Sequence, residues 1–135
     1  MVMNLWFVLL AGVAGYVVGS LWFTVLFGKT WSKLQGFTKT QIEETKKKGM
    51  VVGFIVQFIG TVLMAYVLAF VIKGMGVSGF VGGMGTGIAV WFGFQATIML
   101  GMVLWEKKPF RLYLINVTNY LVAMAIMGGI IAAWA

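Results

Sequence analysis

Few side chains in this sequence could take part in acid–base chemistry. It has no cysteine, histidine or aspartate, and its acids are Glu43, Glu44 and Glu106. Glutamates without a histidine or a cysteine lack the usual partners for acid–base catalysis, nucleophilic catalysis and transition-metal binding. We therefore expect a protein that is not an enzyme and that has no cofactor or metal site.

The other candidate groups are neutral amides and hydroxyls inside long apolar stretches. At 100° per residue, Asn116 and Tyr120 share one helical face with Asn119 beside it, and Gln57 and Thr61 share another. We expect these side chains to face one another inside a helical bundle. This candidate polar cluster comprises Gln57, Thr61, Gln95, Asn116, Asn119 and Tyr120.

Two interpretations of the candidate polar cluster stay open. The amides can form interhelical hydrogen bonds, which are worth about 0.6 kcal/mol each on average and hold helices in register. Alternatively, they line a polar vestibule that opens to the cytoplasm and takes a small polar solute, a lipid headgroup or an ion. The absence of an acid or base inside these stretches weighs against a proton-coupled transporter.

The elements that must position these groups are predicted by composition. Hydrophobic residues make up 61% of the 135 residues and charged residues 10%. Four stretches carry no Asp, Glu, Lys, Arg or His, and each exceeds the ~20 residues that a helix needs to cross a bilayer. They are 4–27, 50–72, 82–104 and 112–134. We predict an all-α membrane protein, with four transmembrane helices in a compact bundle and a single domain over 1–135.

The loops predict the orientation. Nine of the ten Lys and Arg residues lie in loops 28–49 and 105–111, and Lys73 alone lies in the loop between them. The positive-inside rule places the nine in the cytoplasm and both termini on the non-cytoplasmic side. The first stretch lacks a basic start and a clear cleavage site, so we expect a retained helix. A bacterial or archaeal plasma membrane fits these features, and the net charge of +7 does not indicate nucleic acid.

The first basic loop has a helical signal of its own. Thr38 and Gln41 have the spacing of a capping box, and Glu43 and Glu44 precede lysines by four residues. We predict a short cytoplasmic helix over 38–48. Its run of Lys46, Lys47 and Lys48 could attract anionic lipid headgroups. The alternative, which we favour, is that these lysines only enforce topology.

The tryptophans are expected to mark the membrane boundaries. Trp31 and Trp105 are expected at the inner interface, and Trp6 and Trp134 at the outer one. Trp91, in the middle of a stretch, is expected to serve in packing.

Glycines recur at intervals of four residues, which in membranes allow close helix packing. Gly15 and Gly19 form one such pair in the first stretch, and Gly83 and Gly87 form another in the third. We expect these four to be helix-packing positions. The spacing does not distinguish contacts within one chain from those of a homo-oligomer.

Two segments resemble a known family. One is L21-W-F-T-V-L-F-G-K-T-W31, and the other runs from L104-W-E-K-K-P109 through Asn116 and Tyr120 to Gly128. They are similar to small four-helix membrane proteins catalogued as domain of unknown function 1761. The resemblance implies the same architecture and brings no established activity. The positions that carry it are Trp22, Gly28, Trp31, Glu106, Pro109, Asn116, Tyr120 and Gly128, while Lys108 stands where arginine is associated with the family.

Glu106 is the only acid of the 105–111 loop. An exposed ion pair with Lys29, Arg111 or a neighbouring lysine accounts for it simply, at no more than ~1 kcal/mol. The alternative is a gate or headgroup contact at a cytoplasmic mouth formed by Lys29, Glu106 and Arg111.

Taken together, these patterns predict a non-catalytic scaffold or subunit that acts through helix packing within the lipid bilayer. The alternative is an oligomeric channel, transporter or binding protein for a small polar solute or lipid, without proton coupling. An interfacial enzyme acting on lipid or quinone is disfavoured because only Glu43, Glu44 and Glu106 could serve as bases.

Overall fold

The computed structural model describes residues 4–36, 40–41, 43–44 and 51–135. Within these ranges the chain forms helices and no strand, which confirms the predicted all-helical fold. Four helical spans are long and apolar enough to cross a membrane. Their ends lie within two residues of the predicted stretches, at Leu5–Leu26, Val51–Gly74, Phe80–Leu104 and Phe110–Trp134.

Two of the four spans are interrupted by π-helix. The first consists of α1 (Leu5–Leu21) and η1 (Trp22–Leu26). The third consists of α5 (Phe80–Val90), η2 (Trp91–Ala96), α6 (Thr97–Met99) and α7 (Gly101–Leu104). The second and fourth spans are the uninterrupted helices α4 (Val51–Gly74) and α8 (Phe110–Trp134). A π-helical turn holds extra chain and shifts the direction of the side chains on it, and both η1 and η2 begin at a tryptophan.

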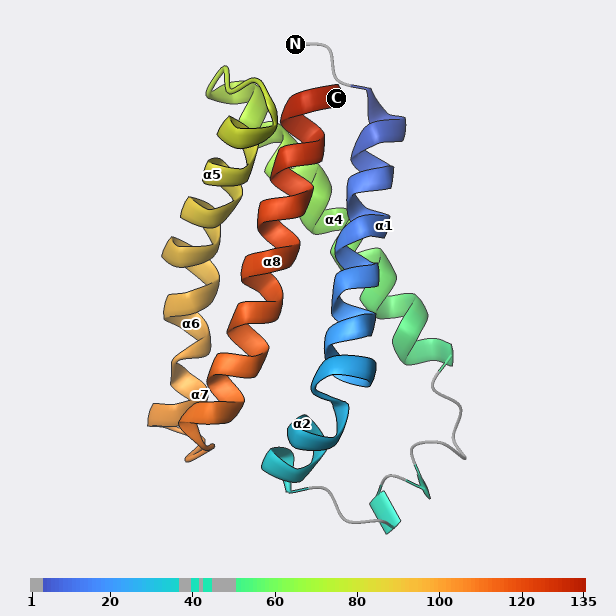
Figure 1. The fold of residues 1–135 in the computed structure, drawn as a ribbon, viewed down its shortest axis with the longest axis vertical. Coiled ribbons are helices and arrows are strands. Elements are labelled where there is room, and N and C mark those ends of the chain that lie inside the picture. Colours follow the sequence, from blue (N-terminus) through green and yellow to red (C-terminus); the bar gives the residue numbers. More distant parts are fainter. Residues whose placement is uncertain (1–3, 37–39, 42, 45–50) are drawn as a thin grey trace.

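Helix α8 lies at the centre of the bundle. Helices α1 and α5 pack along it on either side, and α4 crosses behind α1 and α8 at an angle (Figure 1). In its most apolar stretch 61% of the residues of α8 are buried, against 28% or fewer in each of the other spans. The other three spans therefore each direct much of their apolar surface away from the bundle.

The largest apolar cluster occupies one half of the bundle. Its buried side chains come from the first turns of α1, the last turns of α4 and the last turns of α8, and the largest are Val8, Leu68, Ile72, Met127 and Ile131. Leu112, at the start of α8 in the other half, is also fully buried. In the other half α4 diverges from its neighbours, and every residue from 51 to 57 is exposed. The helices of that half are thus held by contacts that do not involve the start of α4.

Glycines bring the main chains of α5 and α8 into direct contact. A Cβ atom added to Gly83 would lie 2.0 Å from the carbonyl oxygen of Gly128, and one added to Gly87 would lie 2.1 Å from that of Met124. On α1, a Cβ atom at Gly15 would lie 2.6 Å from the sulfur of Met127. The close approach of α5 and α8 therefore depends on the missing side chains.

The basic loop after the first span begins with a helix that the sequence analysis did not predict. Helix α2 (Gly28–Gln35) follows a break at Phe27 and ends at Gly36, whose φ of 77° suits glycine. The Trp31 ring packs edge-on against Phe23, with centroids 5.4 Å apart. The lysines of α2 suggested a solvated loop, whereas the side chain of Trp31 packs α2 against the first span. The predicted helix over 38–48, with Lys46, Lys47 and Lys48, lies largely outside the described residues, of which Thr40, Gln41, Glu43 and Glu44 are helical.

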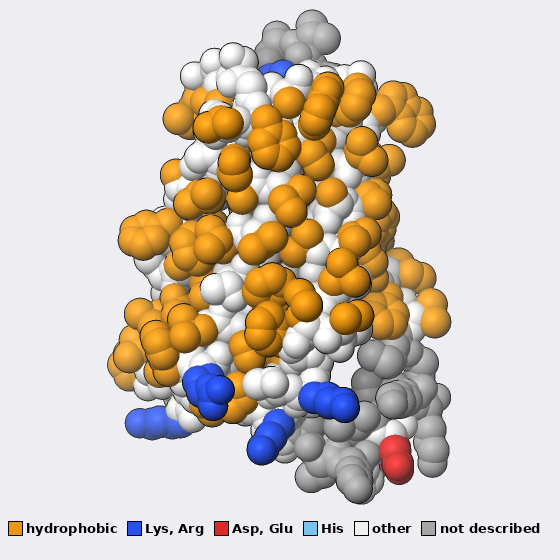
Figure 2. All heavy atoms as spheres, in the orientation of Figure 1, with side chains coloured by type: hydrophobic (Ala, Val, Ile, Leu, Met, Phe, Trp, Pro, Cys, Tyr) orange, Lys and Arg blue, Asp and Glu red, His pale blue; other side chains and the backbone are white. Residues whose placement is uncertain are grey.

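The two ends of the bundle differ in charge. Both termini lie at one end (Figure 1), where the backbone N–H of Asn4 donates to the carbonyl oxygen of Ala135. Helix α2 and the turn between α7 and α8 lie at the opposite end, which we call the basic end. Figure 2 shows most of the visible Lys and Arg side chains at the basic end, below a broad band of hydrophobic side chains.

The close approach of α5 and α8 can be tested with matched glycine variants. Gly87→Ala should lower the free energy of unfolding by about 1–3 kcal/mol, because the new methyl group meets a main-chain carbonyl that cannot rotate away. Gly85→Ala has open space around the new Cβ atom and serves as the control. Equilibrium unfolding in mixed micelles measures both. Equal stability of the two variants would contradict the proposed backbone contact.

Candidate functional site

Three tryptophans donate hydrogen bonds to three consecutive residues of α8. The indole N–H of Trp22 donates to the carbonyl oxygen of Ile115 at 2.8 Å, and that of Trp91 donates to the carbonyl oxygen of Val117 at 2.8 Å. Between them, the indole N–H of Trp31 donates to Oδ1 of Asn116 at 3.0 Å. We call this arrangement the indole collar, and it comprises Trp22, Trp31, Trp91 and residues 115–117.

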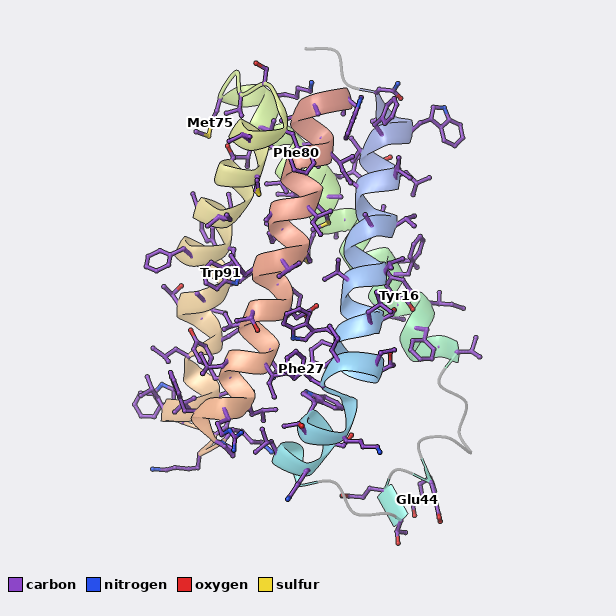
Figure 3. All side chains as sticks on the ribbon, viewed as in Figure 1. Tyr16, Phe27, Glu44, Met75, Phe80 and Trp91 are labelled. Carbon is purple, nitrogen blue, oxygen red and sulfur yellow. The ribbon has the colours of Figure 1, made fainter. Side chains whose placement is uncertain are left out.

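The indole collar joins elements that are distant in the sequence. Trp22 begins η1, Trp31 lies on α2, and Trp91 begins η2. The side chain of Trp91 lies between η2 and α8 (Figure 3). A helical carbonyl oxygen has a second lone pair after its intrahelical bond, so Ile115 and Val117 can each accept an indole N–H without losing helix. A partly buried indole needs such an acceptor. The collar therefore fixes η1, α2 and η2 to the same turn of α8.

Asn116 connects two elements through the two ends of its amide. Oδ1 accepts from Trp31 on α2, and Nδ2 donates to the sulfur of Met102 on α7, 3.8 Å away. The side chain is 9% exposed, so both ends are shielded. Nearby, the hydroxyl of Tyr113 donates to the carbonyl oxygen of Ala96 at 2.7 Å. The polar groups of this part of α8 are therefore used in contacts between helices.

The remaining members of the candidate polar cluster do not converge on Asn116. Thr61 is buried, and its hydroxyl donates to the carbonyl oxygen of Gln57 on its own helix. The expectation that Gln57 faces the other amides is wrong, since its side chain is exposed on the diverging part of α4. Helical periodicity assumed that α4 follows the bundle along its whole length, whereas it crosses at an angle. Tyr120 on α8 is half-buried.

Two buried oxygens have no partner in the structure. Oδ1 of Asn119 and Oε1 of Gln95 are shielded and accept no hydrogen bond. Asn119 is 4% exposed and lies against Gly19 of α1, where an added Cβ atom would be 3.7 Å from Oδ1. An amide oxygen in this state can accept a hydrogen bond from a water molecule or from a small donor.

The predicted cytoplasmic mouth lies at the basic end. Lys29, Glu106 and Arg111 are all exposed, on α2, on the turn after α7 and at the start of α8. Glu106 borders a surface hollow of about 450 Å³, which we call the Trp105 hollow. It is lined by Ile98, Met99, Gly101, Met102, Trp105 and Glu106. In the part of the chain that the structure describes, no three acidic, histidine or cysteine side chains gather as metal ligands.

The model of the family described as "Protein of unknown function (DUF1761)" matches residues 6–132. The chain belongs to this family. The resemblance noted in the sequence is thereby confirmed. No curated protein and no solved structure matches the chain. Several positions that carried the resemblance have structural roles in this DUF1761 chain. The indole collar contains Trp22, Trp31 and Asn116. The contact between α5 and α8 contains Gly128.

The sequence analysis missed the role of the tryptophans. Trp31 was expected to mark a membrane interface, but it is half-buried and bonded to Asn116. Trp91 was expected only to pack, and its N–H is also used. One available signal was a pattern that occurs twice in the sequence. Two glycines four residues apart are followed within four residues by Trp-Phe, at residues 15–23 and again at residues 83–92.

The bond between Trp31 and Asn116 can be tested by removing its donor. Trp31→Phe keeps an aromatic ring but leaves Oδ1 of Asn116 without its indole, so the free energy of unfolding should fall by about 1 kcal/mol. Trp105→Phe, at a side chain that is 83% exposed, should leave stability unchanged. Unfolding in mixed micelles compares the two variants, and equal stability would show that the indole contributes only ring packing.

Proposed function

We propose that this chain is an integral membrane protein that acts as a non-catalytic scaffold or subunit. The observation that carries the proposal is the indole collar, in which Ile115, Asn116 and Val117, near the start of α8, accept hydrogen bonds from tryptophans of other elements. A bundle that uses these acceptors to join its elements is built to hold its own shape. Its outward surfaces are then left for contacts with lipid or with partner helices.

The outer surface supports placement in a membrane. Large apolar side chains around the bundle are widely exposed, including Phe92 at 66%, Phe94 at 71% and Ile98 at 81%. Exposed apolar surface on this scale marks a protein or membrane contact. The charge difference between the ends supports the basic end as cytoplasmic and both termini as non-cytoplasmic. We propose a bacterial or archaeal plasma membrane as the location.

The positions of the acids support a role without catalysis. Glu43, Glu44 and Glu106 are all exposed, and Glu44 lies beyond the helices at the basic end (Figure 3). A catalytic carboxylate usually sits in a cleft where burial or a neighbouring charge tunes its acidity. Exposed side chains at a charged surface are better suited to solvation and to ion pairs.

The unpartnered oxygens favour a second candidate, a binding or permeation protein. Oδ1 of Asn119 and Oε1 of Gln95 are buried acceptors without a protein donor, and such oxygens can accept a hydrogen bond from a small polar solute. Because α8 fills the centre of the bundle, a permeation path would have to lie between copies of the chain. Permeation therefore requires an oligomer, whereas binding does not.

A pair of asparagine variants separates the two candidates. If the chain is a scaffold, Asn119→Leu should keep or raise stability because it removes an unpaired buried acceptor. Asn116→Leu should lower it by about 1 kcal/mol, because it removes two interhelical bonds. Neither should alter solute flux in proteoliposomes relative to the wild type. A flux or a retained small molecule that disappears in folded Asn119→Leu would overturn the scaffold proposal in favour of binding or permeation.

The orientation is testable because the sequence contains no cysteine. Thr30→Cys at the basic end and Ser78→Cys at the opposite end both introduce a thiol at an exposed position. In intact cells a membrane-impermeant maleimide should label Ser78→Cys, and it should label Thr30→Cys only after permeabilisation. The reverse pattern would invert the proposed topology. Equal labelling of each variant from both sides would indicate dual insertion.

A further inference from the structure

The Trp105 hollow is a shaped depression on the outer face of the third span. Gly101 and Trp105 both line it, and Cδ1 of the Trp105 ring lies 3.6 Å from the position of a Cβ atom added to Gly101. Ile98 and Met102 also line the hollow. Ile98 comes three residues before Gly101, and Met102 comes one residue after it. The absence of a side chain at position 101 therefore leaves space beside an aromatic wall.

The turn after α7 holds Glu106 at the edge of the Trp105 hollow. The backbone N–H of Glu106 donates to the carbonyl oxygen of Gly101, and that of Lys108 donates to the carbonyl oxygen of Met102 at 2.9 Å. Between them Lys107 adopts a φ of 58°, the left-handed conformation that ends a helix with these bonds. The main chain thus holds Glu106 at a position where it lines the same hollow as Trp105.

An indole beside a carboxylate is suited to an ammonium group. The ring face attracts a cation through its quadrupole, and the carboxylate adds a full opposite charge. Glu106 also disfavours an anionic headgroup in the hollow itself. Lys107, which follows Glu106 in the chain, is exposed and adds positive charge to this end of the third span.

An apolar track leads to the Trp105 hollow along the third span. Phe94 on η2 and Ile98 on α6 are among the most exposed large apolar side chains of the described residues, at 71% and 81%. The track ends at the hollow, where Trp105 is 83% exposed. An apolar track that ends at an aromatic ring and a charge at the basic end matches the shape of one phospholipid.

We propose that the Trp105 hollow binds a zwitterionic phospholipid. Its ammonium group lies against Trp105 and Glu106, and one acyl chain lies along Ile98 and Phe94. This site rests on the proposed placement in a membrane, with the basic end at the headgroup level. Met102 lines the hollow and contacts Asn116 through its sulfur, so the bound lipid lies next to the indole collar.

Native mass spectrometry from lipid nanodiscs tests the site. Nanodiscs contain equal amounts of phosphatidylethanolamine, which carries an ammonium group, and phosphatidylglycerol, which does not. The wild type should retain phosphatidylethanolamine in preference, and Glu106→Gln and Trp105→Leu should each reduce that preference about fivefold. Glu44→Gln, an exposed acid at the same end, and Trp6→Leu, an exposed tryptophan at the other end, should retain it.

Alkaline carbonate extraction is carried out first on the same proteins. A wild type that stays in the membrane but shows no preference overturns the lipid site alone, as does a preference that survives Glu106→Gln. A wild type that carbonate extracts from the membrane overturns both the membrane placement and the lipid site. If all variants, controls included, lose the preference together, binding does not depend on the hollow and the site is likewise overturned.

Discussion

The arrangement of this bundle depends on α8, because α1, α2, α4 and α5 all pack against it. The indole collar attaches η1, α2 and η2 to residues 115–117, and each indole reaches an acceptor that the helix can offer without breaking its own bonds. A partly buried indole N–H needs a protein acceptor, and α8 provides it for all three tryptophans. This requirement sets the rotation of the first and third spans about their axes, because only one direction lets each tryptophan reach α8.

The two halves of the bundle combine apolar packing and directed hydrogen bonds to different extents. Near the termini, large apolar side chains of α1, α4 and α8 interlock, with Leu68 and Met127 fully buried. Near the basic end α4 diverges, and the directed hydrogen bonds of the indole collar add to the packing of Leu112 and Val117. Directed bonds specify geometry more narrowly than apolar contact does, since they weaken steeply with angle. The basic end is therefore the part of the molecule whose geometry is most closely specified by individual polar groups.

The helices could be predicted from the sequence, but the direction of their side chains could be predicted only in part. A helix needs about 20 residues to cross a bilayer, so four uncharged stretches of at least that length predicted the four spans, and their ends lay within two residues. Periodicity failed at Gln57 because α4 crosses at an angle. The hydrogen bonds of the tryptophans were not predicted because their acceptors lie on α8, far along the sequence. Helix α2 was missed because its attachment depends on Asn116, which lies 85 residues beyond Trp31.

The contact between α5 and α8 differs in kind from every side-chain contact in the bundle. Gly83, Gly87 and Gly128 meet through main-chain atoms, and a glycine has no rotamers to lose when it is buried. Once the helices have formed, this joint immobilises no side chain at those three positions. This close approach is therefore made at almost no cost in side-chain conformational entropy, whereas ordering Met127 or Leu68 in the core restricts several rotatable bonds.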